Sequence, residues 1–330
     1  LVKLFANDLT FAWTDYLLRS EEFLEADIVH CHNLHSNFFD LKTLQRMSLL
    51  KPVVWTIHDL WAFTGYASDS ITRKHPNKKK FLLHLWDNTS HLLSLKNKIY
   101  ARSKLNLVAV SDWMKKEVEQ SILKSQPLTR IYNGVDLEIF KPTDKLAVRN
   151  KLKLPIDKKI VILGTKAWEV SQKIVENENN AGLFFVSVGR TQIRVEEKNL
   201  LSIPHTENRE TLAEYLGAAD LLLYPTHGDS FGLTAAEAMA CGTPVVTWEV
   251  DALPEIVEHK VTGYVAKYGN LDDLQAGIEY ILGQTAEIRE VMAKKCRVKI
   301  SNNFSIENMY REYLDLYQKI TSSPKPQKIN

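Results

Sequence analysis

The chain is poor in cysteine and has no long apolar run. Its three cysteines, Cys31, Cys241 and Cys296, lack the paired spacings of a disulfide framework or a zinc site. We expect them to be buried thiols in a reducing cytosol. No apolar run approaches the roughly 20 residues that a membrane-spanning helix needs. The first residues also lack the basic and apolar segments of a signal peptide.

Neither sign of charge is in excess. The 330 residues include 42 Lys and Arg against 40 Asp and Glu, a net charge of +2, and no nucleic-acid recognition motif, so nucleic acid is not an expected partner. A Gly-x-Gly-x-x-Gly fingerprint is absent, which argues against a dehydrogenase. An apolar content of 45% is ordinary for a globular protein, and the length allows two domains with cores of their own.

Strand-like and helix-like patterns alternate along the chain, which predicts an α/β fold with mostly parallel sheets. The predicted strands are Asp27–His30, Val53–Ile57, Leu107–Val110, Thr129–Tyr132, Ile160–Leu163, Leu183–Val188, Leu200–Ile203, Leu221–Tyr224, Val245–Trp248 and Tyr264–Ala266. The predicted helices are Leu41–Met47, Asp112–Ile122 with Ser111 as N-cap, Ser171–Asn177, Arg209–Ala218, Gly232–Ala240, Leu271–Leu282, Ile288–Lys299 and Ile306–Ile320. We expect a domain over 1–142, a second over 143–304, and a C-terminal helix and tail over 305–330.

The segment from His227 to Val246 is the most informative part of the chain. It predicts a loop, a small-residue helix that Gly242 stops, and an apolar strand. A helix N-terminus offers backbone N–H groups to an anion, and Gly232 lets a ligand approach closely. Glu237 could accept two hydrogen bonds from a diol such as ribose, and Asp229 could hold another hydroxyl. The structural alternative is a capping Asp229 and a buried, satisfied Glu237.

This segment resembles the E-x7-E signature of the retaining glycosyltransferases of group 1 (family 4), with Asp229 in place of the first Glu. The resemblance covers most of the chain from about Ala26, and further similar stretches are Ala26–His35, Lys51–Trp61, Ile131–Pro142 and Asp251–Val265. It implies the GT-B fold, in which two Rossmann-like, doubly wound domains face a cleft. The family normally opens with a strand and a Gly-rich loop, which are not present at the start of this sequence. We therefore expect the first domain to be incomplete there.

The resemblance also implies an activity. Such an enzyme moves a sugar, typically a hexose, from a nucleotide diphosphate sugar to an acceptor hydroxyl with retention of configuration. The donor is a substrate, so no cofactor is expected, and the absence of an Asp-x-Asp element near these motifs implies no divalent metal. Surface polysaccharide or glycan biosynthesis is the expected role. The alternative is a non-catalytic homologue that serves as a donor-binding or scaffolding subunit.

Site residues follow from the resemblance by position. Glu237 would hold the donor ribose, and His58 would line the cleft near the reacting sugar. Lys173 is the best match for the family's diphosphate-binding Lys, and Lys166 is a weak substitute for the usual Arg, because Lys lacks the bidentate fork. Both lysines could instead be solvated. Asp229 and the backbone N–H groups of Phe231, Gly232 and Leu233 would fix the hydroxyls of the donor sugar. Ser230 and Thr234 complete the donor-binding set.

Histidines gather at the end of the first predicted strand. His30, Cys31, His32 and His35 invite comparison with a metal site, but no partner pair has usable spacing, so no metal is expected. For His58, spacing alone equally allows a structural ring whose N–H is tied to Asp59.

The stretch 73–86 mixes a basic run with aromatic and aliphatic residues. It is compatible with a cytoplasmic protein that makes peripheral contact with the inner face of the membrane, where a lipid-linked acceptor would lie. A solvated basic loop that leads into a helix is the favoured alternative.

Overall fold

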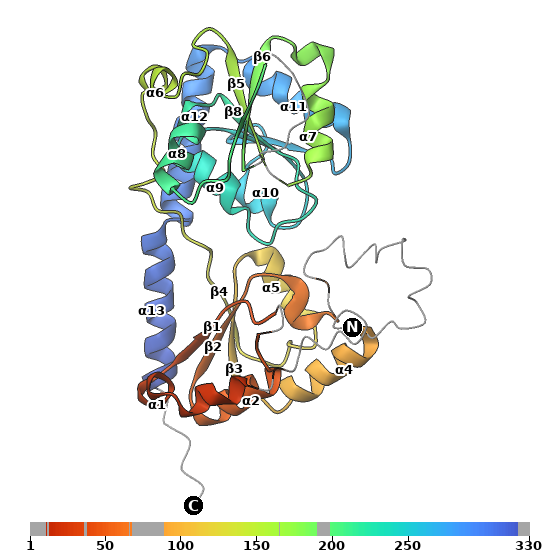
Figure 1. The fold of residues 1–330 in the computed structure, drawn as a ribbon, viewed down its shortest axis with the longest axis vertical. Helices are drawn as coiled ribbons and strands as arrows, with labels where there is room; N and C mark the ends of the chain where they lie inside the picture. Colours follow the sequence, from red (N-terminus) through yellow and green to blue (C-terminus); the bar gives the residue numbers. More distant parts are fainter. Residues whose placement is uncertain are drawn as a thin grey trace, which may run out of the picture. The chain divides into compact units, whose positions relative to one another are not determined.

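The computed structural model describes residues 11, 13–35, 38–65, 67, 89–164, 166–189 and 199–322. The chain forms two compact units, Leu1–Tyr132 with Tyr310–Asn330 and Asn133–Met309 (Figure 1). This division lies ten residues before the predicted boundary at 142. Most of the predicted C-terminal segment 305–330 belongs to the first unit, because its tyrosines hydrogen-bond to residues of the first sheet. Among the described helices, none is long and apolar enough to cross a membrane.

The first unit is built on a four-stranded parallel sheet of order β1-β2-β3-β4. Its strands are β1 (Val29–Cys31), β2 (Val53–Ile57), β3 (Leu105–Ala109) and β4 (Leu128–Arg130). Its helices are η1 (Thr14–Arg19), α1 (Glu21–Glu25), α2 (Leu41–Leu50), η2 (Leu60–Phe63), α4 (Thr89–Tyr100), α5 (Asp112–Glu119) and most of α13 (Ile306–Ser322). Every residue of β2 is buried, as expected for an inner strand that is covered on both faces. Ser111 caps α5 through the N–H of Met114, which confirms the predicted cap.

The second unit is built on a six-stranded parallel sheet of order β10-β9-β8-β5-β6-β7. Its strands are β5 (Lys159–Leu163), β6 (Leu183–Val188), β7 (Leu200–Ile203), β8 (Leu221–Tyr224), β9 (Val245–Trp248) and β10 (Gly263–Ala266). Its helices are α6 (Lys145–Lys151), α7 (Trp168–Val175), η4 (Glu178–Asn180), α8 (Arg209–Ala218), α9 (Leu233–Ala240), α10 (Leu253–Ile256), α11 (Leu271–Leu282) and α12 (Ala286–Asn303). Helices α8, α9 and α12 lie on one side of this sheet, and α7 and α11 lie on the other (Figure 1). The predicted α/β class with parallel sheets is confirmed in both units, and the second sheet has the strand order of a doubly wound fold.

The strand order of the second unit reverses at β5. From β5 the chain adds β6 and β7 on one side, then crosses over to place β8, β9 and β10 on the other. At such a switch point the loops that follow the two neighbouring strands diverge and leave a crevice at the carboxyl edge, where ligands bind. The loops after β5 and β8 are therefore the first place to look for a site.

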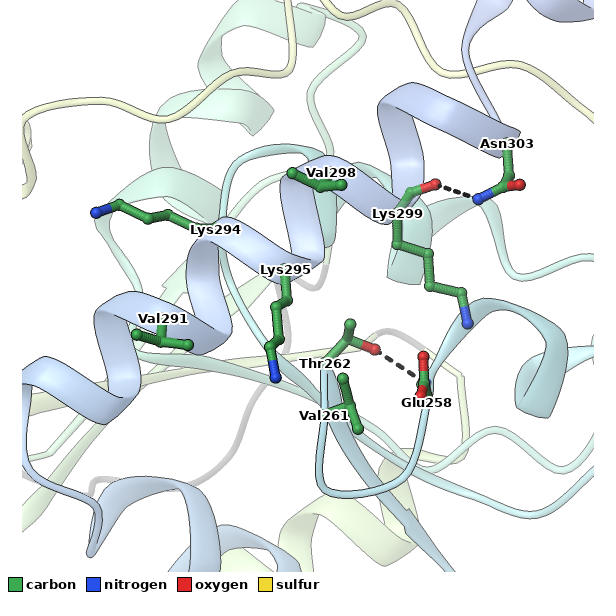
Figure 2. A pocket seen from close by; sticks show the side chains of 9 residues that line it. All are labelled: Glu258, Val261, Thr262, Val291, Lys294, Lys295, Val298, Lys299 and Asn303. Carbon is green, nitrogen blue, oxygen red and sulfur yellow. Dashed lines mark hydrogen bonds between the residues drawn. The ribbon is translucent and has the colours of Figure 1, made fainter.

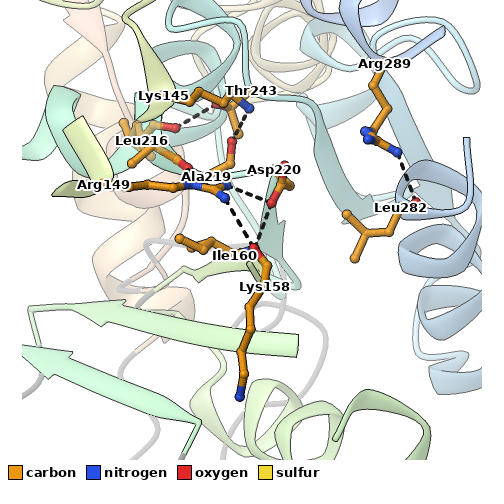
Figure 3. Close-up of polar contacts among 11 residues, drawn as sticks. Lys145, Arg149, Lys158, Ile160, Leu216, Ala219, Asp220, Thr243, Leu282 and Arg289 are labelled. Carbon is orange, nitrogen blue, oxygen red and sulfur yellow. Dashed lines mark hydrogen bonds and ion pairs between the residues drawn. The ribbon is translucent and has the colours of Figure 1, made fainter. Parts of the chain in front are cut away.

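A buried ion pair fixes the opposite edge of this sheet. Asp220 lies just before β8 and accepts hydrogen bonds at 2.8 Å from both the Arg149 guanidinium and the N–H of Ile160 (Figure 3). Arg149 also donates to the carbonyls of Ala218 and Lys158, and Lys145 donates to the carbonyl of Ala219. These contacts attach α6 and the end of α8 to the starts of β5 and β8.

The three cysteines are free and buried in the structure, as predicted. Burial raises the pKa of the Cys31 thiol to about 12, so this side chain behaves as a small apolar residue.

Candidate functional site

The predicted loop residues meet at the switch point of the second sheet. Lys166 follows β5 and Asp229 follows β8, and their Nζ and Oδ2 atoms lie 2.9 Å apart. These two strands are neighbours in the sheet although Lys166 and Asp229 are 63 residues apart in the chain. The parallel topology thus brings a cation and a carboxylate together at the carboxyl edge. Lys166, which the sequence identified only as a weak substitute, is the lysine in contact with the motif.

Asp229 organises the loop that leads into α9. Its Oδ1 accepts hydrogen bonds from the N–H groups of Phe231 at 3.2 Å and Gly232 at 2.8 Å. Its Oδ2 accepts a third hydrogen bond, at 2.7 Å, from the Tyr224 hydroxyl. Burial alone would raise the pKa of Asp229, but the Lys166 ammonium and the Tyr224 hydrogen bond outweigh it, so the pKa lies below its usual value. Asp229 is therefore a fully engaged, ionised carboxylate.

These contacts correct one expectation about the loop. The N–H groups of Phe231 and Gly232 were predicted to face a ligand, but both donate to Asp229. The physical reason is that a short Asx-type turn saturates its own donors before the helix begins. Helix α9 starts at Leu233, one residue later than predicted, so the unpaired donors of its first turn belong to Leu233 and the residues after it.

Gly232 is required by the backbone itself. Its φ of +94° lies in the left-handed region, and a Cβ there would come within 2.6 Å of the Leu253 side chain on α10. The sequence predicted that a small residue serves ligand approach. The structure adds that glycine is needed to turn the chain into α9 and to pack α10 against it.

Glu237 has the opposite environment to Asp229. It lies in the second turn of α9 and is only 8% exposed. Within the described residues no side chain or N–H donates a hydrogen bond to its carboxylate. Burial raises the pKa of Glu237 to about 7, although the positive charge of Arg209 at the start of α8 lowers it in part. Among the described residues, the protein therefore provides no donor that would satisfy Glu237 in the way the structural alternative supposes.

The remaining predicted donor residues differ in their position. Leu233 is exposed and Thr234 is half-buried at the start of α9, and Ser230 is half-buried in the loop. The Thr234 hydroxyl also lies near that of Tyr224. Lys173 is exposed in the last turn of α7, and in the part of the chain that the structure describes it makes no contact with Asp229 or Glu237. Lys166 is therefore better placed than Lys173 to meet an anion at this loop.

A polar aromatic group next to the loop was missed from the sequence. The His227 ring bonds to Glu169 at 3.0 Å and to the Tyr268 hydroxyl at 3.2 Å, and it packs on Trp248. Trp248 and Tyr268 also meet edge to face, with ring centroids 5.2 Å apart. His227 and Tyr268 follow β8 and β10, and Trp248 is the last residue of β9. Their common position at the carboxyl edge of the sheet was the only signal that the sequence offered. They fix the outer side of the loop that carries Asp229.

Histidines meet in the first unit as the strand order predicts. His32 Nδ1 lies 2.9 Å from His58 Nε2, and the two rings stack. Burial, together with the nearby His32, lowers the pKa of His58 to about 4, so His58 is a neutral ring. Asp59 caps η2 and pairs with His35 at 3.0 Å.

His30 of the same group is engaged by protein groups. Its Nε2 bonds to Thr56 at 2.8 Å and its Nδ1 to the Tyr317 hydroxyl of α13 at 2.6 Å. Within the described residues, no three His, Cys, Asp or Glu side chains are arranged to hold a metal ion. The basic stretch 73–86 lies outside these residues.

Comparison with known proteins gives the family. Residues 166–299 match the family described as glycosyl transferases group 1, and residues 2–139 match glycosyltransferase family 4. A curated relative, N-acetyl-alpha-D-glucosaminyl L-malate synthase of Bacillus anthracis, is 25% identical over 240 residues, which are 68% of this chain and 62% of that protein. The chain thus spans about three-fifths of the length of this relative.

Solved structures agree in fold. Sucrose-phosphate synthase from Thermosynechococcus elongatus superimposes with a TM-score of 0.71 at 18% identity, over 90% of this chain and 74% of that one. Anabaena Alr3699/HepE in complex with UDP superimposes with a TM-score of 0.70 at 16% identity, over 92% and 81%. The two family matches together cover most of the chain, which therefore belongs to the group 1 glycosyltransferases of the GT-B fold.

Proposed function

We propose that this protein is a retaining glycosyltransferase that binds a nucleotide diphosphate sugar at the switch point of the second sheet and transfers the sugar to an acceptor hydroxyl. The observation that carries the proposal is Glu237, a buried carboxylate near a helix N-terminus to which none of the described residues donates a hydrogen bond. Such a group costs stability in the empty protein and is satisfied when a ligand supplies hydroxyl donors. The ribose diol of a nucleotide is such a ligand. The fold neighbour that binds UDP supports the same class of donor.

The diphosphate would meet Lys166 and the first turn of α9. The N–H groups at Leu233 and Thr234 and the positive end of the helix dipole attract an anion. The Lys166 side chain is more than half exposed, and its Nζ is held at this edge by Asp229. In this proposal Asp229 positions the lysine and the loop, and direct contact with the sugar falls to groups beyond it. Lys173 would contribute only at longer range.

The transfer itself would need no dedicated base. The bond between the anomeric carbon and the phosphate oxygen breaks, and the acceptor oxygen attacks from the same face. The departing phosphate oxygen takes the acceptor's proton, and Lys166 and the helix N-terminus stabilise the negative charge that grows on it. His58, a neutral ring in the first unit, would contact the reacting sugar. Metal independence, a hexose donor, a glycan or lipid-linked acceptor, cytoplasmic location and peripheral membrane contact through 73–86 belong to this proposal.

The alternative of a non-catalytic, donor-binding homologue is favoured by one observation. Asp229 has a structural role as the organiser of the loop, so a chain released from catalysis would still keep it. Glu237 argues the other way, because it has no such role and its burial is unfavourable.

A transfer assay separates the two. Sugar nucleotides based on UDP, GDP and ADP are incubated with candidate glycan acceptors in the presence of a chelator. The proposal predicts release of one nucleoside diphosphate that Glu237→Gln abolishes without unfolding the protein. Binding of a donor without any turnover would favour the non-catalytic alternative, and turnover unchanged by Glu237→Gln would contradict the assigned site.

A further inference from the structure

A second concave surface lies at the opposite edge of the same unit. Helix α12 and the loop that precedes β10 enclose a hollow of about 580 Å³ (Figure 2). The loop residues Glu258, Val261 and Thr262 come just before the amino end of β10, whereas the candidate donor site lies at the carboxyl ends of β5 and β8. The hollow is therefore separate from the proposed chemistry.

The floor of the hollow is an apolar stripe on α12. Val291 and Val298 are 52% and 54% exposed, and Ile288, one turn earlier on the same face, is 47% exposed. Residues 288, 291, 295 and 298 follow the three-and-four spacing of coiled-coil core positions, with Lys295 at one of them. The stripe is about 15 Å long at 1.5 Å per residue. Exposed β-branched residues in this pattern on a charged helix favour contact with another helix.

The rim of the hollow is cationic. Lys294, Lys295 and Lys299 project around the stripe, and among the described residues that line the hollow Glu258 is the one carboxylate (Figure 2). Lys294 pairs with Glu290 of α12 at 2.7 Å, so the charge offered to an occupant comes mainly from Lys295 and Lys299. Lys299 is half-buried, and burial lowers its pKa even though Glu258 raises it in part. An additional carboxylate above Lys295 and Lys299 would offset this unfavourable burial. The charge therefore selects an acidic occupant.

We propose that this surface, defined by α12 and residues 258–262, binds an acidic amphipathic helix of a partner protein. The partner's aliphatic residues would pack on Ile288, Val291 and Val298, and its flanking carboxylates would pair with Lys295 and Lys299. A second copy of α12 fits poorly, because its own lysines would face these lysines. A lipid surface fits less well too, since the surface is concave and its lining residues include no aromatic side chain.

The test measures binding of a synthetic acidic peptide to the full chain. The peptide has four heptads, with Leu at the a and d positions and Glu at e and g. Fluorescence anisotropy of the labelled peptide should show saturable binding. The double variant Val291→Ser with Val298→Ser should weaken it at least about tenfold, the size expected for losing two buried valines. Lys295→Glu should weaken it as well. The matched control is Leu146→Ser, an equally exposed aliphatic residue on α6, which should leave binding unchanged.

Three results would overturn the proposal. The first is no saturable binding, and the second is equal loss in Leu146→Ser. The third is a protein that does not bind the peptide but binds phosphatidylglycerol vesicles, with vesicle binding abolished in the valine variants. This result would assign the surface to a membrane. The same valine variants should bind nucleoside diphosphate as tightly as the wild type. Failure of the α12 proposal can therefore be told apart from failure of the proposed function.

Discussion

Asp229 and Glu237 belong to one loop and helix, yet their surroundings shift their pKa values in opposite directions. Asp229 receives three hydrogen bonds and an ion pair, whereas Glu237 receives no donor from the described residues. Two nearby carboxyl groups whose surroundings shift their pKa values apart usually have different roles. Here Asp229 organises the loop, and the proposed function assigns the donor ribose to Glu237.

The raised pKa of Glu237 predicts a pH-dependent cost to the fold. The folded pKa of about 7 exceeds the ordinary value of 4.5, so the folded state favours the protonated acid. No cost is present below about pH 4.5. The cost grows as pH rises towards 7 and is then constant, at about 3 kcal/mol for the full shift. Glu237→Gln should therefore gain stability relative to the wild type over this pH range. The measurement is urea unfolding of both proteins over this pH range. A difference in the free energy of unfolding that does not change with pH would mean that Glu237 is solvated or satisfied.

Asp229→Asn should destabilise the second unit. The amide keeps one acceptor for the loop N–H groups but loses the charge that holds Lys166 and one of the acceptors for Tyr224. We expect a loss of about 1–3 kcal/mol, measured by thermal unfolding. Asp144→Ala is the matched control, because Asp144 also accepts two N–H groups, those of Leu146 and Ala147, but on the exposed start of α6. It should cost about 1 kcal/mol and leave nucleotide affinity intact. Equal effects of the two changes on affinity would contradict the role given to Asp229.

At the scale of elements, the turn into α9 depends on Gly232. Gly232→Ala must place a Cβ at a φ of +94° and within 2.6 Å of Leu253, so it combines backbone strain with a clash. Gly269→Ala is the control, since Gly269 has a φ of +77° with nothing within 4 Å. We expect about 1 kcal/mol for Gly269→Ala and at least about 2 kcal/mol for Gly232→Ala, with weaker nucleotide binding only in the latter. Equal losses in chemical unfolding would show that packing on α10 is unimportant.

The elements were predictable where the periodicity was strong. The strands Leu183–Val188, Leu221–Tyr224 and Val245–Trp248 and the helix Leu271–Leu282 match the predicted bounds, because apolar runs between turn residues define inner strands. Helix α6 was missed, since Lys145–Lys151 has little apolar periodicity and is held by Asp144 and the Arg149–Asp220 pair. Helix α7 begins three residues before the predicted start, after Ala167 in a left-handed conformation that no pattern signals.

The candidate site was predictable in its residues but not in its contacts. Sequence spacing pointed to Asp229 and Glu237, and the resemblance to the family pointed to Lys166 as a weak substitute for the usual Arg. It gave no means to know that Tyr224 donates to Asp229, or that Lys166 rather than Lys173 approaches it. Such contacts depend on the strand order, which brings β5 beside β8, and on side-chain directions at the sheet edge.

At the scale of the molecule, the chain leaves the first unit after Tyr132 and returns to it at Tyr310. The return is fixed by two hydroxyls of α13, which place Tyr313 against Thr56 at 2.8 Å and Tyr317 against His30 at 2.6 Å. The first unit is thus assembled from both ends of the chain, and α13 is part of its architecture.

Replacing both tyrosines should loosen that attachment. Tyr313→Phe with Tyr317→Phe removes two partly buried hydrogen bonds and leaves Thr56 and His30 short of partners, at a cost of about 2 kcal/mol. Hydrogen exchange should accelerate in α13 and in β1 and β2, and Tyr310→Phe, an exposed change on the same helix, should have no effect. Unchanged exchange in the double variant would mean that other contacts hold α13.

The most direct test of the central claim is calorimetric titration of the wild type and Glu237→Gln with UDP, GDP and ADP, without metal, from about pH 5 to about pH 8. We predict binding of one diphosphate that Glu237→Gln abolishes. We also predict that wild-type affinity falls as pH drops below about 7, where Glu237 becomes protonated and can no longer accept from both hydroxyls of a diol with two charged oxygens. Binding that is indifferent to both the substitution and pH, or no binding by the folded protein, would contradict the account.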